Sequence, residues 1–150
     1  MRKPLAVCLI LQQLAGETAG VLLLSYATAK GRRRGWDALS HLCFSKYLRL
    51  DRARSDGFVN AAIALLDAGA DPNTGFMNED HGPKPTFESV LYAAASVAHH
   101  PGLTRLLLER GADPNDDEVP YHSPETLDNR AIKILVESGK LTPDSRLIRR

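Results

Sequence analysis

The sequence predicts an all-α protein in which short helical units stack as a solenoid, and three observations support this prediction. A phrase of nine residues occurs twice, at 65–73 and 107–115, with Gly-Ala-Asp-Pro-Asn unbroken in both copies. Apolar residues recur at helical intervals in the segments that precede these copies. The composition, 43% hydrophobic and 25% charged over 150 residues, fits a single packed domain. Two copies of one phrase indicate that the chain was built by repetition.

Each copy of the phrase describes the end of a helix and a tight turn. Two leucines complete the apolar side of the helix, and Gly69 or Gly111 then takes a left-handed conformation that a residue with a Cβ adopts only at a cost. In the Asp-Pro-Asn that follows, Asp bonds the backbone two residues on, Pro fixes φ and Asn tolerates a positive φ. The turn therefore explains Asp71 and Asp113, which we do not expect to be catalytic.

Residues 1–35 are expected to form an N-terminal helical pair or cap, followed by a basic link. Two apolar segments with helical spacing, separated by Gly16, predict the pair. A secretory signal peptide is the alternative, because the chain has a basic start and Ala27-Thr28-Ala29 has the form of a cleavage site. Polar residues within 12–18 interrupt the apolar region, and this favours the helices.

The rest of the chain is expected to form three helical units, each beginning at a capping residue. The units cover approximately residues 36–73, 74–115 and 116–150. Asp37 and Asp56 are placed to cap the two helices of the first unit, the first of these running to Leu50. Thr86 is expected to cap an alanine-rich helix of the second unit, and Ser123-Pro124 to begin a helix of the last unit.

The segment 74–85 is predicted to be an irregular, exposed loop. Its glycines and prolines argue against a helix or a central strand. Phe76 and Met77 are expected at an apolar tip that contributes little to the core. Because long loops in compact domains are often functional, we expect a short Gly-Ser replacement to preserve the melting temperature and to weaken partner binding.

Helix, turn, helix and Gly-Ala-Asp-Pro-Asn together resemble the ankyrin repeat, whose period is about 33 residues. The family's unit opens with Thr-Pro-Leu-His-x-Ala-Ala, and residues 89–95 read Ser-Val-Leu-Tyr-Ala-Ala-Ala, which depart from that pattern at the second and fourth positions. The resemblance implies an ankyrin-type helical solenoid with short finger loops. The interval of 42 residues from Gly69 to Gly111 then implies an insertion, which we place in the segment 74–85.

The resemblance also implies a function, because ankyrin repeats bind other proteins along their finger loops and adjoining first helices. We interpret the chain as a protein-interaction module, monomeric and without catalytic activity or cofactor. Exposed aromatic residues beside charges suit recognition. The predicted partner-binding residues are Phe76, Met77, Asp80, His81, Phe87, Tyr92, Asp116, Asp117, Tyr121 and His122. The alternative for Phe87 and Tyr92 is packing beneath the loop.

Composition argues against several other classes of partner. The net charge of +1 predicts neither nucleic-acid nor membrane binding, and no segment approaches the roughly 18 apolar residues of a membrane span. The arginines at 32–34 are interpreted as a solvated connector, with a nucleic-acid or targeting role as the alternative. Cys8 and Cys43 are expected to be free buried thiols of a cytoplasmic protein, the alternatives being a disulfide or a metal pair.

No motif in the sequence indicates an active site. His99-His100 is interpreted as the end of a helix, because adjacent helical residues face different directions and cannot easily share a metal. The acidic stretches 78–81 and 113–118 lack the alternating spacing of a calcium loop, so we predict no metal site. Two alternatives remain: a structural or inhibitory subunit that covers one fixed enzyme or toxin, and a metal-binding or enzymatic protein that uses the inserted loop.

Overall fold

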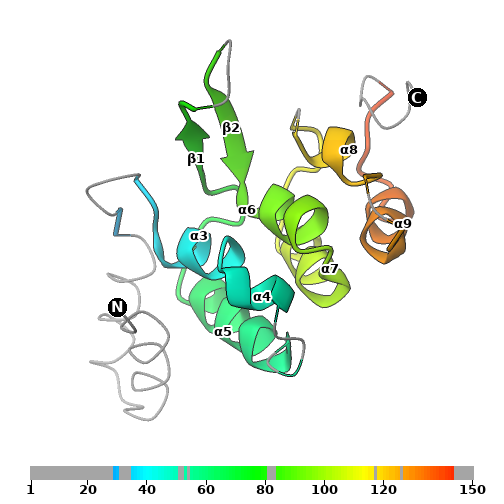
Figure 1. Cartoon of the computed structure of the whole chain (residues 1–150). Helices are drawn as coiled ribbons and strands as arrows, with labels where there is room; N and C mark the ends of the chain where they lie inside the picture. The colour runs from blue at the N-terminus through cyan, green and yellow to red at the C-terminus, as the bar shows by residue number, and fades with distance from the viewer. Residues whose placement is uncertain are drawn as a thin grey trace.

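A computed structural model describes residues 29–30, 35–50, 53, 55–80, 84–116, 118–125 and 127–143 (Figure 1). The predicted N-terminal helical pair and the three arginines of the basic link lie outside these residues. The elements, in chain order, are α3 (Ala38–Cys43), α4 (Lys46–Leu50), α5 (Ser55–Asp67), β1 (Gly75–Asn78), β2 (Thr86–Ser89), α6 (Val90–Tyr92), the π-helix η2 (Ala93–Val97), α7 (Pro101–Glu109), α8 (Glu118–His122) and α9 (Arg130–Glu137).

The predicted all-α, ankyrin-type solenoid with short finger loops is wrong, because the described chain contains a two-stranded antiparallel sheet and is mixed α/β. Strands β1 and β2 form a hairpin that projects from the helical body (Figure 1). Met77 lies opposite Phe87, a pairing of large side chains that suits a pleated surface. A Cβ on Gly75 would lie 2.2 Å from the backbone oxygen of Glu88, so the strands approach this closely only because residue 75 is glycine.

The hairpin also corrects two predictions, one about the segment 74–85 and one about Thr86. Phe76 is 8% exposed and packs against Trp36 and Phe44, with ring centroids 4.9 and 5.0 Å away. The segment therefore contributes to the core, and a Gly-Ser replacement would remove a buried ring. Thr86 is a strand residue, not a helix cap. Ser89 caps α6 instead, its side chain accepting a hydrogen bond from the Tyr92 N–H at 2.9 Å.

The core is centred on α7. Helix α7 packs against both α5 and α9 (Figure 1). Helices α6 and η2 cover α7, and they also contact α3, α8 and α9. Large side chains fill the centre, including the fully buried Leu91, Leu103, Leu107 and Leu135. Ala93, Ala94 and Ala95 are completely buried, and such small side chains let neighbouring helices approach closely.

The prediction that a left-handed glycine ends the helix is confirmed at both copies of the repeated phrase. Gly69 has φ of 91° and Gly111 has φ of 99°. The N–H of the residue after each glycine donates a hydrogen bond to the carbonyl oxygen of the first leucine of the phrase. The N···O distance is 3.0 Å in the first copy and 2.9 Å in the second. Gly139, which ends α9, also has a positive φ. Identical local sequence therefore produces the same turn twice.

The asparagine of each phrase ties its turn to the next one. Asn73 donates its side-chain amide to the Gly111 carbonyl at 3.2 Å and accepts the Asp113 N–H at 2.8 Å. Asn115 makes the same pair of bonds to residues 140 and 142, at 2.9 and 2.8 Å. These bonds align successive turns along one side of the protein.

Several helix boundaries differ from the prediction. Asp37 does cap α3, accepting the Ser40 N–H at 2.8 Å, but that helix ends at Cys43 and α4 is separate. Helix α5 begins at Ser55, so Asp56 lies in its first turn. Ser123-Pro124 does not begin a helix: Ser123 is buried after α8, where its hydroxyl donates to the Val119 carbonyl at 2.5 Å.

Candidate functional site

One surface carries a continuous line of aromatic side chains, which we call the aromatic row. Successive rings lie close together: Phe44 and Phe76 are 5.0 Å apart, Phe44 and Tyr92 6.4 Å, and Tyr92 and His122 5.7 Å between centroids. At these separations the rings contact one another in tilted or edge-to-face arrangements. The full row is Trp36, His41, Phe44, Phe76, Tyr92, His122 and Tyr121.

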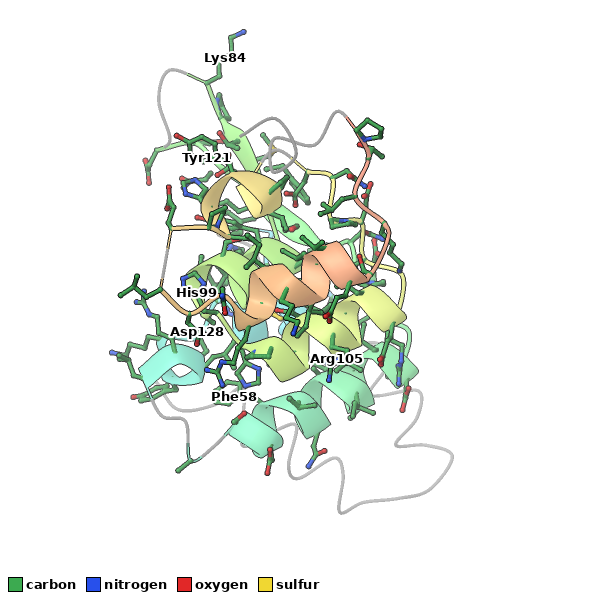
Figure 2. The ribbon with its side chains drawn as sticks, turned by 90° about the vertical axis from the view of Figure 1, so that its right-hand side faces the viewer. Phe58, Lys84, His99, Arg105, Tyr121 and Asp128 are labelled. Carbon is green, nitrogen blue, oxygen red and sulfur yellow. The ribbon has the colours of Figure 1, made fainter. Side chains whose placement is uncertain are left out.

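The row crosses four elements because α6 packs between α3 and α8. Phe44 is the C-cap of α3, Phe76 comes from β1 and Tyr92 is the last residue of α6. Figure 2 shows Tyr121, on α8, on the side of the protein that carries the hairpin, whose outer end is marked by Lys84. Most rings of the row are half-buried or exposed, and Phe76 is the buried member. The row is thus part core and part surface.

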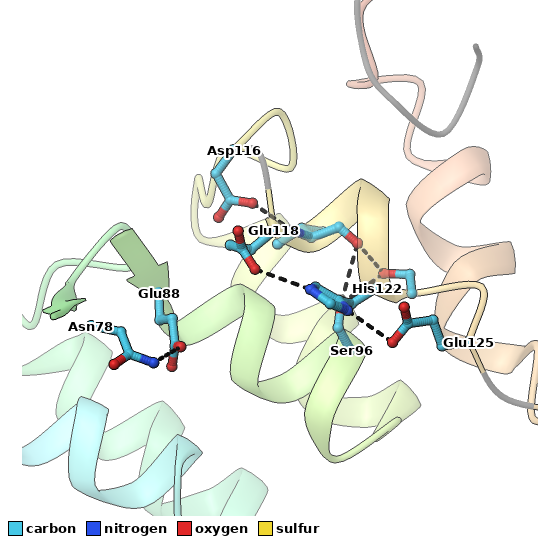
Figure 3. Close-up of polar contacts among 9 residues, drawn as sticks. Asn78, Glu88, Ser96, Asp116, Glu118, His122 and Glu125 are labelled. Atoms are coloured by element: carbon cyan, nitrogen blue, oxygen red, sulfur yellow. Dashed lines mark hydrogen bonds and ion pairs between the residues drawn. The ribbon is translucent and has the colours of Figure 1, made fainter. Parts of the chain in front are cut away.

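Four carboxylates lie near enough to Tyr92 to act on its hydroxyl, and we call them the carboxylate group: Glu88, Asp116, Glu118 and Glu125. Figure 3 shows these four side chains on β2 and around α8. They come from β2, from the turn before α8 and from α8 and the residues after it, which are neighbours because α8 packs against β2. His122 lies between two of them, with Nε2 at 3.1 Å from Glu118 and Nδ1 at 2.8 Å from Glu125. Glu88 accepts a hydrogen bond from Asn78 at 2.6 Å.

The crowding of negative charge affects the acids inside it. Burial raises the pKa of Tyr92 to about 12, and the four carboxylates add to that shift by opposing a phenolate. Burial also raises the pKa of Asp116, and the adjacent Glu118 acts in the same direction, although hydrogen bonds from Ser89 and the Val119 N–H oppose them. Tyr92 therefore keeps its hydroxyl proton at neutral pH. In the described part of the chain, no lysine or arginine pairs with the carboxylate group.

The structure describes eight of the ten predicted partner-binding residues, and these differ in exposure. Met77, Asp80, Phe87 and Tyr121 are exposed, whereas Tyr92, Asp116 and His122 are half-buried. The prediction of Phe76 at an exposed tip is wrong, because its side chain points into the aromatic row. His81 and Asp117 lie outside the described residues.

The hairpin side chains clarify what Phe87 does. Phe87 is 41% exposed and Met77 is 53% exposed, and they are direct cross-strand neighbours. The Phe87 ring covers Gly75, since its Cζ would lie 2.7 Å from a Cβ built there. The two side chains therefore form an exposed apolar pair on the hairpin, which we call the hairpin pair.

Sequence reasoning missed six members of the aromatic row and the carboxylate group: Trp36, His41, Phe44, Glu88, Glu118 and Glu125. Glu118 and His122 have a helical i, i+4 spacing, and this signal in the sequence could have indicated their pairing. Trp36, Phe44 and Glu88 carry no such signal, because they reach the surface through tertiary packing.

A concave region lies away from the aromatic row, where α5 and α7 begin. It is an open cleft of about 650 Å³, and His99 and His100 line it. The prediction that these histidines finish a helix is wrong for His100, which caps α7 by accepting the Leu103 N–H at 3.1 Å. His99 has φ of 46°, a conformation that histidine tolerates better than most residues.

Few other groups in the described residues could bind a metal ion or react. No three His, Cys, Asp or Glu side chains among them are arranged to hold a metal ion. The Cys43 thiol is buried and free, and burial raises its pKa, so it stays protonated. None of the described helices is both long enough and apolar enough to cross a membrane.

Comparison with protein-family models, with curated proteins and with solved structures finds no match. The resemblance to the ankyrin-repeat family, which depends on the two copies of the repeated phrase, stays a prediction.

Proposed function

We propose that the chain is a protein-interaction module without catalytic activity, which binds another protein through the aromatic row and the hairpin pair. The observation that carries the proposal is the gathering of partly exposed rings from α3, α6 and α8 on one surface, next to the buried Phe76 of β1. Aromatic side chains provide large contact area, and they dominate the energetics of many protein interfaces.

Packing holds these side chains in place before any partner arrives. Tyr92 contacts both Phe44 and His122, and His122 is held in turn by Glu118 and Glu125. Side chains that are already ordered lose less entropy on binding, which favours affinity. Met77 and Phe87 add an exposed apolar contact on the other face of the hairpin, since side chains alternate along β1 and Phe76 points into the aromatic row.

We also propose that the module acts as a monomer in the cytoplasm. The free, buried thiol of Cys43 supports that compartment, since disulfides are rare there. Fractionation of the native cell tests the compartment, and sedimentation of the purified chain tests the oligomeric state.

Affinity capture from the native cell, quantified by mass spectrometry, tests the binding surface. Met77→Ser combined with Phe87→Ser removes the hairpin pair, and Val136→Ser is the control because it removes an exposed apolar side chain from α9. We expect proteins captured by the wild type and by the control to be lost with the double variant. Far-UV circular dichroism checks that all three fold. A captured set that the double variant leaves unchanged would overturn the proposal.

A further inference from the structure

His100 connects the beginnings of two helices through both nitrogens of its ring. Its Nδ1 accepts a hydrogen bond from the Leu103 N–H at 3.1 Å, and this bond caps α7. Its Nε2 lies 2.7 Å from the hydroxyl of Ser55, the first residue of α5. His100 is 9% exposed, and α5 and α7 pack against each other. The ring therefore links these two helices where both begin.

The two bonds determine which nitrogen of the ring carries hydrogen. Because Nδ1 accepts the Leu103 N–H, it has no hydrogen of its own. The single hydrogen of the neutral ring then lies on Nε2, which donates it to the Ser55 hydroxyl. A second proton can be added only at Nδ1, where it would point at the Leu103 N–H. Protonation of His100 therefore breaks the hydrogen bond that caps α7.

The backbone of His100 is held firmly at this junction. Its N–H donates to the Ala94 carbonyl of η2 at 2.8 Å, and its carbonyl accepts the N–H and the hydroxyl of Thr104, each at 3.0 Å. A Cβ built on Gly102 would lie 3.5 Å from the His100 ring and 3.5 Å from Val59 of α5. The ring is thus placed by η2, α7 and α5 together.

The charges described around the adjoining cleft nearly offset one another. The charged or titratable side chains that line this cleft with His100 are Arg49 of α4, Asp56 of α5, His99 and Arg130 of α9. Arg130 is paired with Asp128 at 2.6 Å, so two arginines stand against two aspartates. Burial and the positive end of the α7 dipole both disfavour a charged ring. These two effects act in the same direction as the bond to Leu103.

We propose that His100 is a pH-sensitive switch at the junction of α5 and α7. The neutral ring holds the two helix starts together, and a proton taken from solvent onto Nδ1 opens the first turn of α7. The open form binds this proton more readily than the closed form, so the stability of the junction is present above roughly pH 6.5, where a free imidazole titrates, and is lost as the pH falls. The switch lies away from the aromatic row, and the inference does not depend on the proposed function.

Amide hydrogen exchange of the purified full chain, followed by NMR, tests the switch directly. The protection factor of the Leu103 N–H should fall roughly threefold to tenfold between about pH 7 and pH 5.5. The internal control is the Tyr92 N–H, whose acceptor at 2.9 Å is the Ser89 hydroxyl, a cap that does not titrate. Ring nitrogen shifts should place the hydrogen on Nε2 at pH 7. Equal changes at Leu103 and Tyr92, or a doubly protonated ring with Leu103 still protected, would overturn the inference.

Two matched variants separate the switch from general acid destabilisation. His100→Asn keeps a side chain that caps helices but does not titrate. His99→Asn removes the neighbouring histidine of the same cleft, at a positive φ that asparagine also tolerates. Between about pH 7 and pH 5.5, the unfolding equilibrium constant in urea should rise roughly threefold to tenfold more for the wild type and for His99→Asn than for His100→Asn. Parallel curves for the wild type and His100→Asn would contradict the switch, and if His100→Asn does not fold, the exchange of the wild type decides.

Discussion

Two carboxylate–hydroxyl pairs, Asp37 with Thr74 and Asp116 with Ser89, occupy corresponding places in the two halves of the molecule. In each half, the residue that caps a helix is hydrogen-bonded to the residue that follows a copy of the repeated phrase. The carboxylate lies on the helix cap in the first half and after the turn in the second. The same connection is therefore built twice with its two residue types exchanged.

The charged neighbours of the two pairs differ in sign. Burial would raise the pKa of Asp37, but hydrogen bonds from Thr74, the Ser40 N–H and Lys30 outweigh it, so the pKa is lowered. Burial raises the pKa of Asp116 and outweighs the hydrogen bonds from Ser89 and the backbone, and the negative charge of Glu118 adds a smaller rise. The shifts are opposite because the hydrogen bonds together outweigh burial at Asp37, where the Lys30 ammonium supplies one of them, whereas burial outweighs the hydrogen bonds at Asp116.

Removal of the two carboxylates should give the largest contrast. Asp37→Ala removes a helix cap and leaves Thr74 and Lys30 without a buried partner, so we expect a loss of roughly 2–3 kcal/mol in the free energy of unfolding. Asp116→Ala also removes hydrogen bonds, but relieves a buried negative charge beside Glu118, so we expect about 0–1 kcal/mol. Urea unfolding measures both. Equal losses would contradict the comparison.

Exchanging the residue types of the first pair should have an intermediate effect. Asp37→Ser keeps a capping side chain, and Thr74→Asp alone places a second carboxylate beside the first. The double variant restores a carboxylate–hydroxyl pair beside Lys30, in the arrangement of the second half. We expect it to be more stable than the sum of the single changes by about 1 kcal/mol, within the range for residues in contact. A double-mutant cycle gives this number, and a coupling of zero would show that the pairs are not interchangeable.

The smallest expected effect is the loss of the Lys30 ammonium beside Asp37, and its size depends on pH. A lowered pKa means that Asp37 adds stability above its unfolded value of about 3.9, and that this stability is lost as the pH falls through the folded pKa. Lys30→Met should therefore cost up to about 1 kcal/mol at neutral pH, since Lys30 is half exposed, and almost nothing near pH 2.

Asp116 should show the opposite dependence on pH. Because its pKa is raised, its contribution is present below the unfolded value and is lost as the pH rises through the folded pKa. As the pH rises from acidic to neutral, the free energy of unfolding of Asp116→Asn should therefore increase relative to that of the wild type. Urea unfolding at a series of pH values tests both variants, and parallel curves would contradict the opposite shifts.

The sequence by itself determined the features that depend on neighbours within a few residues. The left-handed conformations of Gly69 and Gly111 follow from the chemistry of a helix end and a turn, and both are found where the repeated phrase predicts them. Asp37 was identifiable as a cap for the same reason, since the N–H that it accepts lies three residues on.

Tertiary structure alone decided the hairpin, the aromatic row and the exchanged pairs. The glycines and prolines of 74–85 predict an irregular loop, but Phe76 gains burial against Trp36 and Phe44 once the chain folds back, and Gly75 then permits the close strand pairing. Asp37 and Thr74 are 37 residues apart, and nothing local to either indicates the other. Contacts of this kind depend on how helices pack, and a local pattern carries no information about that packing.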